Sequence, residues 1–408
     1  MRIGIDCRTI LNPKRGERAG VGHYSYYLVK NILKQDKRNE YVLFFDYRFQ
    51  NTHEFKQKNV KIRCFPFSQY KKFLPFSYSH MLIAAFLKRE KLDLYHSPAN
   101  VIPYYYNGPS VVTVHDLAIY RHPEWFPRGQ KFSISVLVPR SLNKALRLIA
   151  VSEATKKDIV KVFKVPQKKI QVVYEGVLHE TTKTTDLAIT HKHGIKGKYL
   201  LYVGTIEPRK NLVLLVRAFS KLVKKSKAMS KYTLVLAGHR GWKSDKIFKE
   251  IKKQGLEEQV KYLDYVSHED KLALMKHATV FVFPTLYEGF GLPVLEAMNQ
   301  GTPVISSNAS SVPEVTGSAA VLVNPKSETA LTEAMKKVLS SSASRKKLGR
   351  NGIEQAKKFR WSKCAKETIQ IYREEFKKLP KKKKPVDKPS KSARIKKLIP
   401  RFRKKKKS

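Results

Sequence analysis

The sequence predicts an α/β protein with two doubly wound parallel sheets, and three observations support this fold class. The chain has 408 residues, which exceeds the usual size of one hydrophobic core. Short β-rich runs alternate with amphipathic helical stretches from one end to the other, as in parallel sheets covered by helices. The alternation comes in two series, so we expect two domains.

The first series predicts an N-terminal domain over residues 1–178. Its expected strands read RIGID, YVLFF, LDLYHS, SVVTVHD and LRLIAVS. Residues 179–198 follow. This stretch is polar and rich in threonine and lysine, which is typical of a linker.

The second series begins at Tyr199 and predicts a C-terminal domain over residues 199–360. Its expected strands read YLLYVGT, YTLVLAG, VKYLDYV, TVFVFPT, TPVISS and AAVLVN. A long amphipathic helix, FRWSKCAKETIQIYREEFKK, follows and includes residues 361–376. Residues 377–408 combine prolines, few apolar residues and dense positive charge, so we expect a disordered basic tail.

The formal net charge of +49 indicates polyanionic surroundings, such as nucleic acid, anionic lipid or phosphorylated substrates. Residues 377–408 hold 17 Lys and Arg and one Asp, which leaves +33 for the other 376 residues.

No nucleic-acid-binding module is recognisable, so we expect no specific nucleic-acid partner. An anionic membrane surface fits better, because Ile395, Leu398, Ile399 and Phe402 recur at helical spacing among the tail charges. A solvated tail is the alternative.

The sequence gives no sign of secretion or of a membrane span. MRIGIDCRTI lacks the signal-peptide pattern, and no apolar run reaches the roughly 18 residues that span a bilayer. Cys7, Cys64 and Cys364 are far apart, which favours a reducing compartment. We expect a cytoplasmic protein, peripheral at the inner face of the cell membrane. The apolar run His80–Leu87 fits either a core helix or a helix lying on a membrane surface.

The loops after the strands carry the candidate site, because ligands bind beyond the carboxyl ends of strands in doubly wound sheets. After the first strand, Gly16, Gly20 and Gly22 precede an expected helix, where backbone N–H groups can approach an anion. The spacing is not that of a dinucleotide fingerprint, and a flexible turn is the alternative. His115 ends the TVHDL strand, where it can donate a hydrogen bond or carry a proton, or serve only structure.

The loop YVGTIEPRKNL follows the first strand of the second series. Its strand ends at Gly204, and Arg209 and Lys210 lie near the start of the next helix. Cations at a helix N-terminus oppose the macrodipole, at a cost of up to about 1 kcal/mol, and a bound anion reverses that cost. Arg209 and Lys210 are therefore candidates to neutralise a phosphate group, with a solvated charged turn as the alternative.

The stretch FPTLYEGFGLPVLEAMNQG predicts a strand, a loop and a helix with Pro293 in its first turn and Gly301 beyond its end. Glu288 lies on the loop and Glu296 in the first turns of the helix. Gly289 to Leu292 would present backbone N–H groups to an anion. If a diphosphate binds at this helix end, it would repel the carboxylates, and the two acids would then bind hydroxyl groups, as on sugars. Charges that simply complement the helix dipole are the alternative.

These loops together resemble the retaining glycosyltransferases of family 4, over roughly residues 1–376. The resemblance rests on EGFGLPVLE, VGTIEPRKNL, TVHDL, RLIAVSEATKKDI, VVYEGV, LVLAGHRGW and YVSHEDKLALM in this order. TVHDL and EPRKN are most similar to mannosyltransferase-like members. The family implies the GT-B fold, in which two Rossmann-like domains face each other across a cleft. It also implies that the helix over 361–376 crosses back to the N-terminal domain.

The resemblance implies a role for each candidate residue. Glu288 would lie at the reacting carbon of the donor sugar, with His115 close to that sugar as a second catalytic candidate. The implied donor-binding residues are Arg209 and Lys210 on the diphosphate, Phe290, Gly291 and Leu292 through their backbone, Glu296 on the ribose, Val266 at the nucleobase, and Gly204. Gly20 and Gly22 would form the acceptor or phosphate loop. Many relatives carry an arginine where this chain has Thr205, so the diphosphate would rest on Arg209 and Lys210.

The implied reaction moves a hexose of mannose or glucose type from a nucleotide-diphosphate sugar, GDP-mannose or UDP-hexose, to a glycan or lipid-linked acceptor. No Asp-x-Asp motif is present, so we expect no metal and no cofactor, with fixed cations stabilising the leaving group. Glu288 would stabilise a cationic sugar during front-face transfer, or act as a covalent nucleophile. Another GT-B enzyme, such as an epimerase or phosphorylase, and a nucleic-acid-binding protein are the alternative functions.

Overall fold

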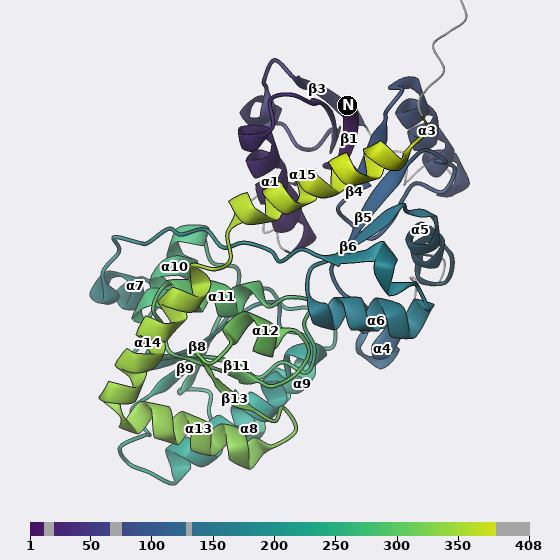
Figure 1. Cartoon of the computed structure of the whole chain (residues 1–408). Helices are drawn as coiled ribbons and strands as arrows, with labels where there is room; N and C mark the ends of the chain where they lie inside the picture. The colour runs from purple at the N-terminus through teal and green to yellow at the C-terminus, as the bar shows by residue number, and fades with distance from the viewer. Residues whose placement is uncertain (12–19, 66–75, 128–132, 381–408) are drawn as a thin grey trace, which may run out of the picture.

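The computed structural model describes residues 1–11, 20–65, 76–127 and 133–380. They form two α/β domains, each with one parallel sheet covered by helices (Figure 1). The predicted fold class is therefore confirmed. The expected disorder and membrane helix of the tail concern residues that lie almost entirely outside the described part of the chain.

The described residues of the N-terminal domain form a seven-stranded parallel sheet. In spatial order the strands are β3 (Val60–Phe65), β2 (Glu40–Asp46), β1 (Arg2–Asp6), β4 (Leu94–Ser97), β5 (Ser110–Val114), β6 (Arg147–Ala150) and β7 (Ile170–Val172). The helices are α1 (Val21–Gln35), α3 (Phe76–Arg89), α4 (Ala118–Arg121), α5 (Val138–Lys144) and α6 (Glu153–Phe163). The strand order reverses between β1 and β4, the position where doubly wound folds bind ligands.

The C-terminal domain contains a six-stranded parallel sheet with the same kind of reversal, between β8 and β11. In spatial order the strands are β10 (Val260–Leu263), β9 (Thr233–Ala237), β8 (Tyr199–Val203), β11 (Val280–Phe283), β12 (Val304–Ser307) and β13 (Val321–Val323). The helices are α7 (Asp186–Lys192), α8 (Leu212–Lys224), α9 (Asp245–Gln254), α10 (His268–His277), α11 (Leu292–Asn299), α12 (Val312–Thr316), α13 (Glu328–Ser340) and α14 (Ser342–Ala356).

Two strands of the N-terminal sheet were not predicted from the sequence, and both lie at its edges. β3 reads VKIRCF and keeps most of its residues partly exposed, so its composition is less apolar than that of a buried strand. β7 reads IQV and has three residues, too few for a periodic signal.

Residues 179–198, expected to be a linker, contain a helix in their second half. Thr185 caps α7 by accepting a hydrogen bond from the backbone N–H of Ala188, at 3.3 Å. Ile189 and Ile195 are buried in the core of the C-terminal domain. The second half of the expected linker is therefore part of that domain, because two apolar side chains bury themselves there.

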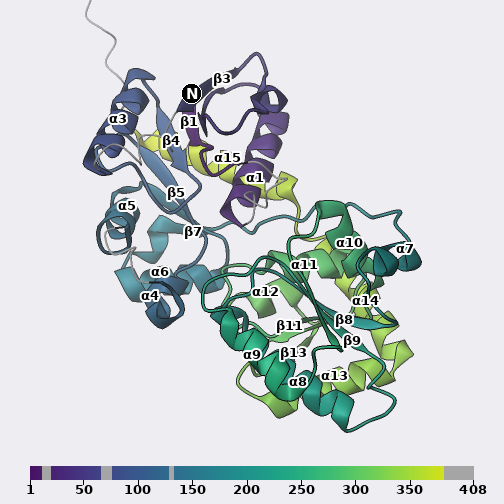
Figure 2. The same ribbon diagram turned by 180° about the vertical axis from the view of Figure 1, so that it is seen from behind.

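The last helix, α15 (Trp361–Lys378), lies against α1 of the N-terminal domain (Figures 1 and 2). The indole ring of Trp361 stacks on the ring of Tyr27 with centroids 5.7 Å apart. Further along, the Tyr372 hydroxyl lies 2.6 Å from Nδ1 of the buried His96 on β4. The chain thus begins and ends its described part in the same domain.

Helix α3, which contains the apolar run His80–Leu87, has one buried and one exposed apolar face. Ile83 and Leu87 are buried in the N-terminal core, as a core helix requires. Met81 and Phe86 remain 48% and 43% exposed. Among the described residues, none of the helices combines the length and apolar character that crossing a bilayer demands.

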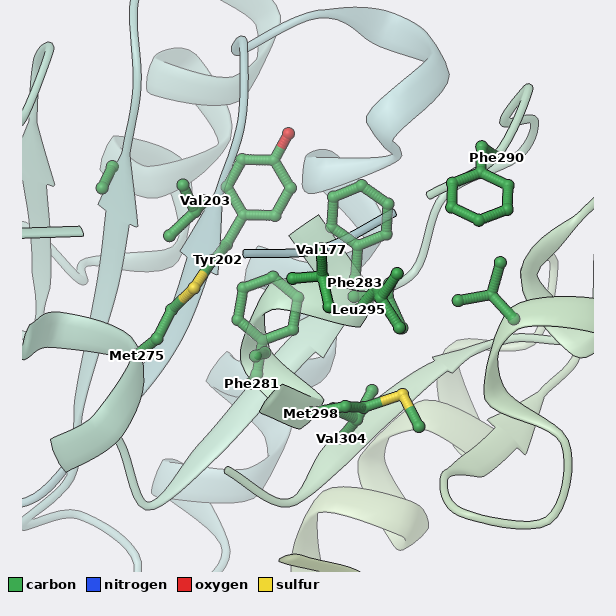
Figure 3. Close-up of a cluster of buried hydrophobic side chains, with 14 of the residues drawn as sticks. Val177, Tyr202, Val203, Met275, Phe281, Phe283, Phe290, Leu295, Met298 and Val304 are labelled. Carbon is green, nitrogen blue, oxygen red and sulfur yellow. The ribbon is translucent and has the colours of Figure 1, made fainter. Parts of the chain in front are cut away.

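The C-terminal core contains side chains of β8, β11 and α11, among them Tyr202, Phe283 and Leu295 (Figure 3). The rings of Tyr202 and Phe283 stack with centroids 5.6 Å apart, and Phe281 stacks on Phe283 at 5.9 Å. The Tyr202 hydroxyl donates a 3.0 Å hydrogen bond to the carbonyl oxygen of Thr205. Packed aromatic rings thereby fix the ends of β8 and β11.

We predict that acid destabilises the protein through His96. Burial, with the nearby His115, lowers the pKa of His96 from 6.5 to about 3. Below pH 6.5 the unfolded chain binds a proton that the folded chain does not, so stability falls as the pH falls, by about 1 kcal/mol per pH unit. Thermal unfolding between pH 6.5 and 5 should show this loss. His96→Gln should lower Tm at pH 7 but flatten the pH slope, and an unchanged slope would contradict the prediction.

Candidate active site

The candidate site lies at the domain interface, where loops from both sheets meet. The loops after the neighbouring strands β8 and β11 carry Arg209, Lys210 and Glu288. The loop after β5 carries His115 and Asp116, and Arg209 Nη1 reaches 3.8 Å from Asp116 Oδ2. These residues are far apart in the chain, and the carboxyl ends of the strands bring them together.

Glu288 is the centre of a buried ion cluster. Its Oε1 accepts hydrogen bonds from Lys210 Nζ at 2.5 Å and from Thr285 Oγ1 at 2.9 Å. Its Oε2 lies 3.6 Å from Nη1 of Arg209. Glu288 and Lys210 are both buried, so neither charge is compensated by water.

The pKa shifts within this cluster follow from burial and from opposite charge. Burial alone would raise the pKa of Glu288, but Lys210 and Arg209 hold it below its usual range. Burial, aided by Arg209, lowers the pKa of Lys210. Burial opposes charge on Arg209 too, yet Glu288, Glu207 and Asp116 together raise its pKa. Glu288 is thus a carboxylate that depends on two cations for its charge.

The two cations are arranged on a short turn, not on the following helix itself. Pro208–Lys210 form one 3-10 turn, and Asn211, with φ of 62°, leads into α8. Arg209 Nε donates to Glu207 Oε1, while Lys210 Nζ lies 5.1 Å from the ring centroid of Phe283. The turn directs both side chains toward the loop that carries Glu288.

His115 is held by protein groups on both ring nitrogens. Nε2 lies 2.8 Å from the carbonyl oxygen of Pro98, and Nδ1 lies 3.4 Å from Oε1 of the buried Glu175. The ring edge also contacts Tyr24, with centroids 4.7 Å apart. The imidazole is therefore fixed in orientation beyond the end of β5.

The backbone of His115 contacts the loop of Glu288 directly, at Gly289. A Cβ atom on Gly289 would lie 2.0 Å from the His115 carbonyl oxygen, so only glycine permits this approach. The Gly289 carbonyl oxygen accepts hydrogen bonds across the interface from Ser152 Oγ at 2.7 Å and Thr155 Oγ1 at 3.3 Å. Thr155 Oγ1 also donates to the His115 carbonyl oxygen at 3.1 Å.

Glu296 has a cationic partner of its own. Its Oε1 accepts a 2.5 Å hydrogen bond from Lys271 Nζ on α10. Burial would raise the pKa of Glu296, but Lys271, His23 and His268 lower it. The two acids of the motif therefore lie in separate charge environments, one at each side of the N-terminus of α11.

The N-terminus of α11 has open space in front of it. Gly291 caps the helix with φ of 104°, and a Cβ built there would meet no atom within 4 Å. Phe290 turns its ring inward, toward Tyr174 and Phe359, and contributes to the core at its edge (Figure 3). Leu292 begins α11. The N-cap of α11 is thus open on the side of Gly291, next to the first N–H groups of the helix, which have no acceptor within it.

The remaining candidates lie at strand ends and helix starts of both domains. Gly204 ends β8 with φ of 150°, and its carbonyl oxygen packs against Gly238. Val266, between β10 and α10, packs its side chain against the core. Gly20 is the N-cap of α1 and Gly22 is buried within α1. Gly16 lies outside the described residues.

Several residues of this site were not found by sequence reasoning. These residues are Lys271 on α10, Glu175 after β7, and Ser152 and Thr155 at the start of α6. All four lie within stretches that carry the family resemblance, RLIAVSEATKKDI, VVYEGV and YVSHEDKLALM, and this was the signal that could have found them. In the part of the chain that the structure describes, no three His, Cys, Asp or Glu side chains gather so as to hold a metal ion.

Comparison with known proteins identifies the family. Residues 18–180 match the family model described as Glycosyltransferase Family 4, and residues 186–355 match the model of the glycosyl transferases group 1. The chain is 31% identical, over 375 residues, to O-antigen chain mannosyltransferase B of Escherichia coli, covering 88% of this chain and 97% of that protein. The chain belongs to the glycosyltransferases of this family.

Solved structures show the same fold for this glycosyltransferase. Sucrose-phosphate synthase from Thermosynechococcus elongatus superimposes with a TM-score of 0.70 at 20% identity, over 92% of this chain and 99% of that one. Anabaena HepE in complex with UDP and glucose superimposes with a TM-score of 0.70 at 18% identity, over 92% and 100% of the two chains. The two facing Rossmann-like domains are thus those of the GT-B fold.

We predict that Gly289→Ala reduces glycosyl transfer by more than tenfold with little change in Tm. The added methyl group would overlap the His115 carbonyl oxygen and prevent the domains from approaching. Gly255→Ala is the matched control. It adds a methyl in open space at φ of 64°, with local strain of about 1 kcal/mol. Equal transfer rates in both variants would contradict this role of Gly289.

Proposed function

We propose that the enzyme is a retaining, metal-independent hexosyltransferase that uses a nucleotide-diphosphate sugar. The observation that carries the proposal is the buried cluster of Glu288, Lys210 and Arg209 beside the open N-terminus of α11. It combines one carboxylate for a developing sugar cation with two cations for a leaving diphosphate. Such fixed charges lower a transition-state energy because they need no reorganisation when the reaction occurs.

In this proposal the donor diphosphate competes for the cations that now pair with carboxylates. Arg209 lies among Glu288, Glu207 and Asp116, so an entering diphosphate would take over part of its coordination. Lys210 and the first N–H groups of α11 supply further positive potential. The charge that builds up on the leaving phosphate is then neutralised by protein groups alone.

During transfer, the bond from the anomeric carbon to the phosphate oxygen breaks, and a bond to the acceptor oxygen forms on the same face. The proton of the acceptor hydroxyl passes to the leaving phosphate. Glu288 stabilises the positive charge on the sugar in this front-face route. A covalent glycosyl–Glu288 intermediate is the alternative, and it would require the carboxylate to leave its two cations.

The transferred sugar is proposed to be mannose, and the acceptor a glycan or lipid-linked glycan in polysaccharide synthesis. The support is the likeness to O-antigen chain mannosyltransferase B, which covers nearly the full length of both proteins. The TVHDL and EPRKN stretches agree with this assignment. GDP-mannose is accordingly the first donor to try, with UDP-glucose second.

The test is a donor screen by thermal shift, with GDP-mannose, UDP-glucose and UDP-N-acetylglucosamine. A donor at 100 times its Kd should stabilise the protein by about 2.7 kcal/mol.

The variants Arg209→Ala and Lys210→Met should each need at least ten times more donor than the unchanged protein to reach the same thermal shift. Glu288→Gln should keep the shift but lose transfer by about 100-fold. Full transfer by both Glu288→Gln and Glu288→Ala would refute a catalytic role, and no shift with any donor would refute donor binding.

We further propose that the enzyme works at an anionic membrane surface on the cytoplasmic side. The N-terminal domain exposes Met81 and Phe86 on α3, followed by the exposed Lys88, Arg89 and Lys91. The sequence beyond residue 380 adds a dense basic segment. Each Lys or Arg near such a surface contributes about 1 kcal/mol to binding.

Co-sedimentation with vesicles of phosphatidylglycerol and phosphatidylcholine tests the membrane proposal. The full chain should bind at low salt and release at high salt, since the attraction is electrostatic. A variant lacking residues 381–408 should bind the vesicles at least tenfold more weakly than the full chain. Adding Phe86→Ser to that variant should weaken vesicle binding further. Equal binding of full and truncated chains would exclude the tail as the anchor.

A further inference from the structure

Glu314 on α12 caps a helix of the opposite domain. Its Oε2 accepts a 2.7 Å hydrogen bond from the backbone N–H of Glu153, and its Oε1 accepts one of 2.7 Å from that of Ala154. These are the first two residues of α6. Oε2 also accepts a 3.2 Å hydrogen bond from the hydroxyl of Tyr174, which follows β7.

The N-terminus of α6 is incomplete without this carboxylate. Ser152, the N-cap, satisfies only the third N–H, that of Thr155, at 3.0 Å. The first two N–H groups have no acceptor within the helix, as at every α-helix start. Glu314 supplies both acceptors at once, and its negative charge complements the helix dipole.

The same end of α6 holds the reacting loops in place. Ser152 and Thr155 donate to the carbonyl oxygen of Gly289, next to Glu288. Thr155 also donates to the carbonyl oxygen of His115. One turn later, Asp158 Oδ2 accepts a 2.7 Å hydrogen bond from Tyr287. A displacement of the α6 N-terminus would therefore move the Glu288 loop away from the His115 loop.

We propose that Glu314 is a positioning residue that aligns Glu288 for transfer by capping α6 across the domain interface. Among the described residues, every hydrogen-bond partner of its carboxylate belongs to the N-terminal domain. Separation of the domains leaves a carboxylate and two helix N–H groups without these partners. The cap therefore favours the closed arrangement in which the site is assembled, and it acts on Glu288 through α6.

Three variants weaken or remove the cap, two on the acceptor side and one on the donor side. Glu314→Ala removes the acceptor, and Glu314→Gln retains one carbonyl oxygen. Glu153→Pro removes one donor N–H and is compatible with the helix, because proline favours the first helical position. The preceding Ser152 already has the extended conformation that proline requires, with φ of −155° and ψ of 163°. Glu153→Ala keeps the N–H, and Glu333→Ala alters an exposed acid of α13, so both are controls.

The kinetic test rests on the proposed function, because it measures transfer from the donor found in the screen. Loss of the cap should lower kcat about tenfold in Glu314→Ala and about threefold in Glu314→Gln and Glu153→Pro, with donor KM changed less than twofold. Glu153→Pro combined with Glu314→Ala should be no slower than Glu314→Ala alone. Reduced kcat in Glu153→Ala, or full kcat in Glu314→Ala, would overturn the proposal.

A second measurement requires no substrate, so it separates failure of this proposal from failure of the proposed function. Small-angle X-ray scattering of the full chain should give a larger radius of gyration for Glu314→Ala than for Glu333→Ala. Hydrogen exchange at the amides of Glu153 and Ala154 should accelerate at least tenfold in Glu314→Ala. Unchanged scattering and exchange would overturn the proposal even if no donor is ever turned over.

Discussion

The site depends on keeping the Glu288 carboxylate charged in a buried place. Water does not solvate it, so Lys210, Arg209 and Thr285 supply the stabilisation that water would provide elsewhere. Their positions follow from rigid supports, since stacked aromatic rings fix the ends of β8 and β11 beneath them. The two cations that keep this buried negative charge stable are the ones to which the proposed function assigns the leaving diphosphate.

The candidate site as a whole, unlike the ion cluster of Glu288 itself, draws residues from both domains. The N-terminal domain contributes His115, Asp116 and the N-terminus of α6. The C-terminal domain contributes Glu288, Gly289 and Glu314. The absence of a side chain at Gly289 allows carbonyl groups of both domains to meet hydroxyl donors of α6. A small change in the angle between the domains would therefore alter several hydrogen bonds at once.

Much of this architecture can be predicted from the sequence. All six strands of the C-terminal sheet were predicted, because buried parallel strands are continuous apolar runs. The edge strands β3 and β7 were not predicted, because β3 is partly exposed and β7 is short, and both properties weaken the apolar signal. The loops of Glu288 and of Arg209 could be singled out from glycines and charges at strand ends. The pairing of Lys271 with Glu296 and the capping of α6 by Glu314 were not predicted, because both depend on contacts between segments distant in the sequence.

The path of the chain has a mechanical consequence. It crosses from the N-terminal to the C-terminal domain once, returns after α14, and packs α15 along α1. The basic sequence beyond residue 380 therefore extends from the domain that also carries α3 with its exposed Met81 and Phe86. In the proposed membrane arrangement, a surface that binds this sequence is tethered to the N-terminal domain. The C-terminal domain, which carries the loops of Glu288 and Arg209, is then held to that surface through the N-terminal domain.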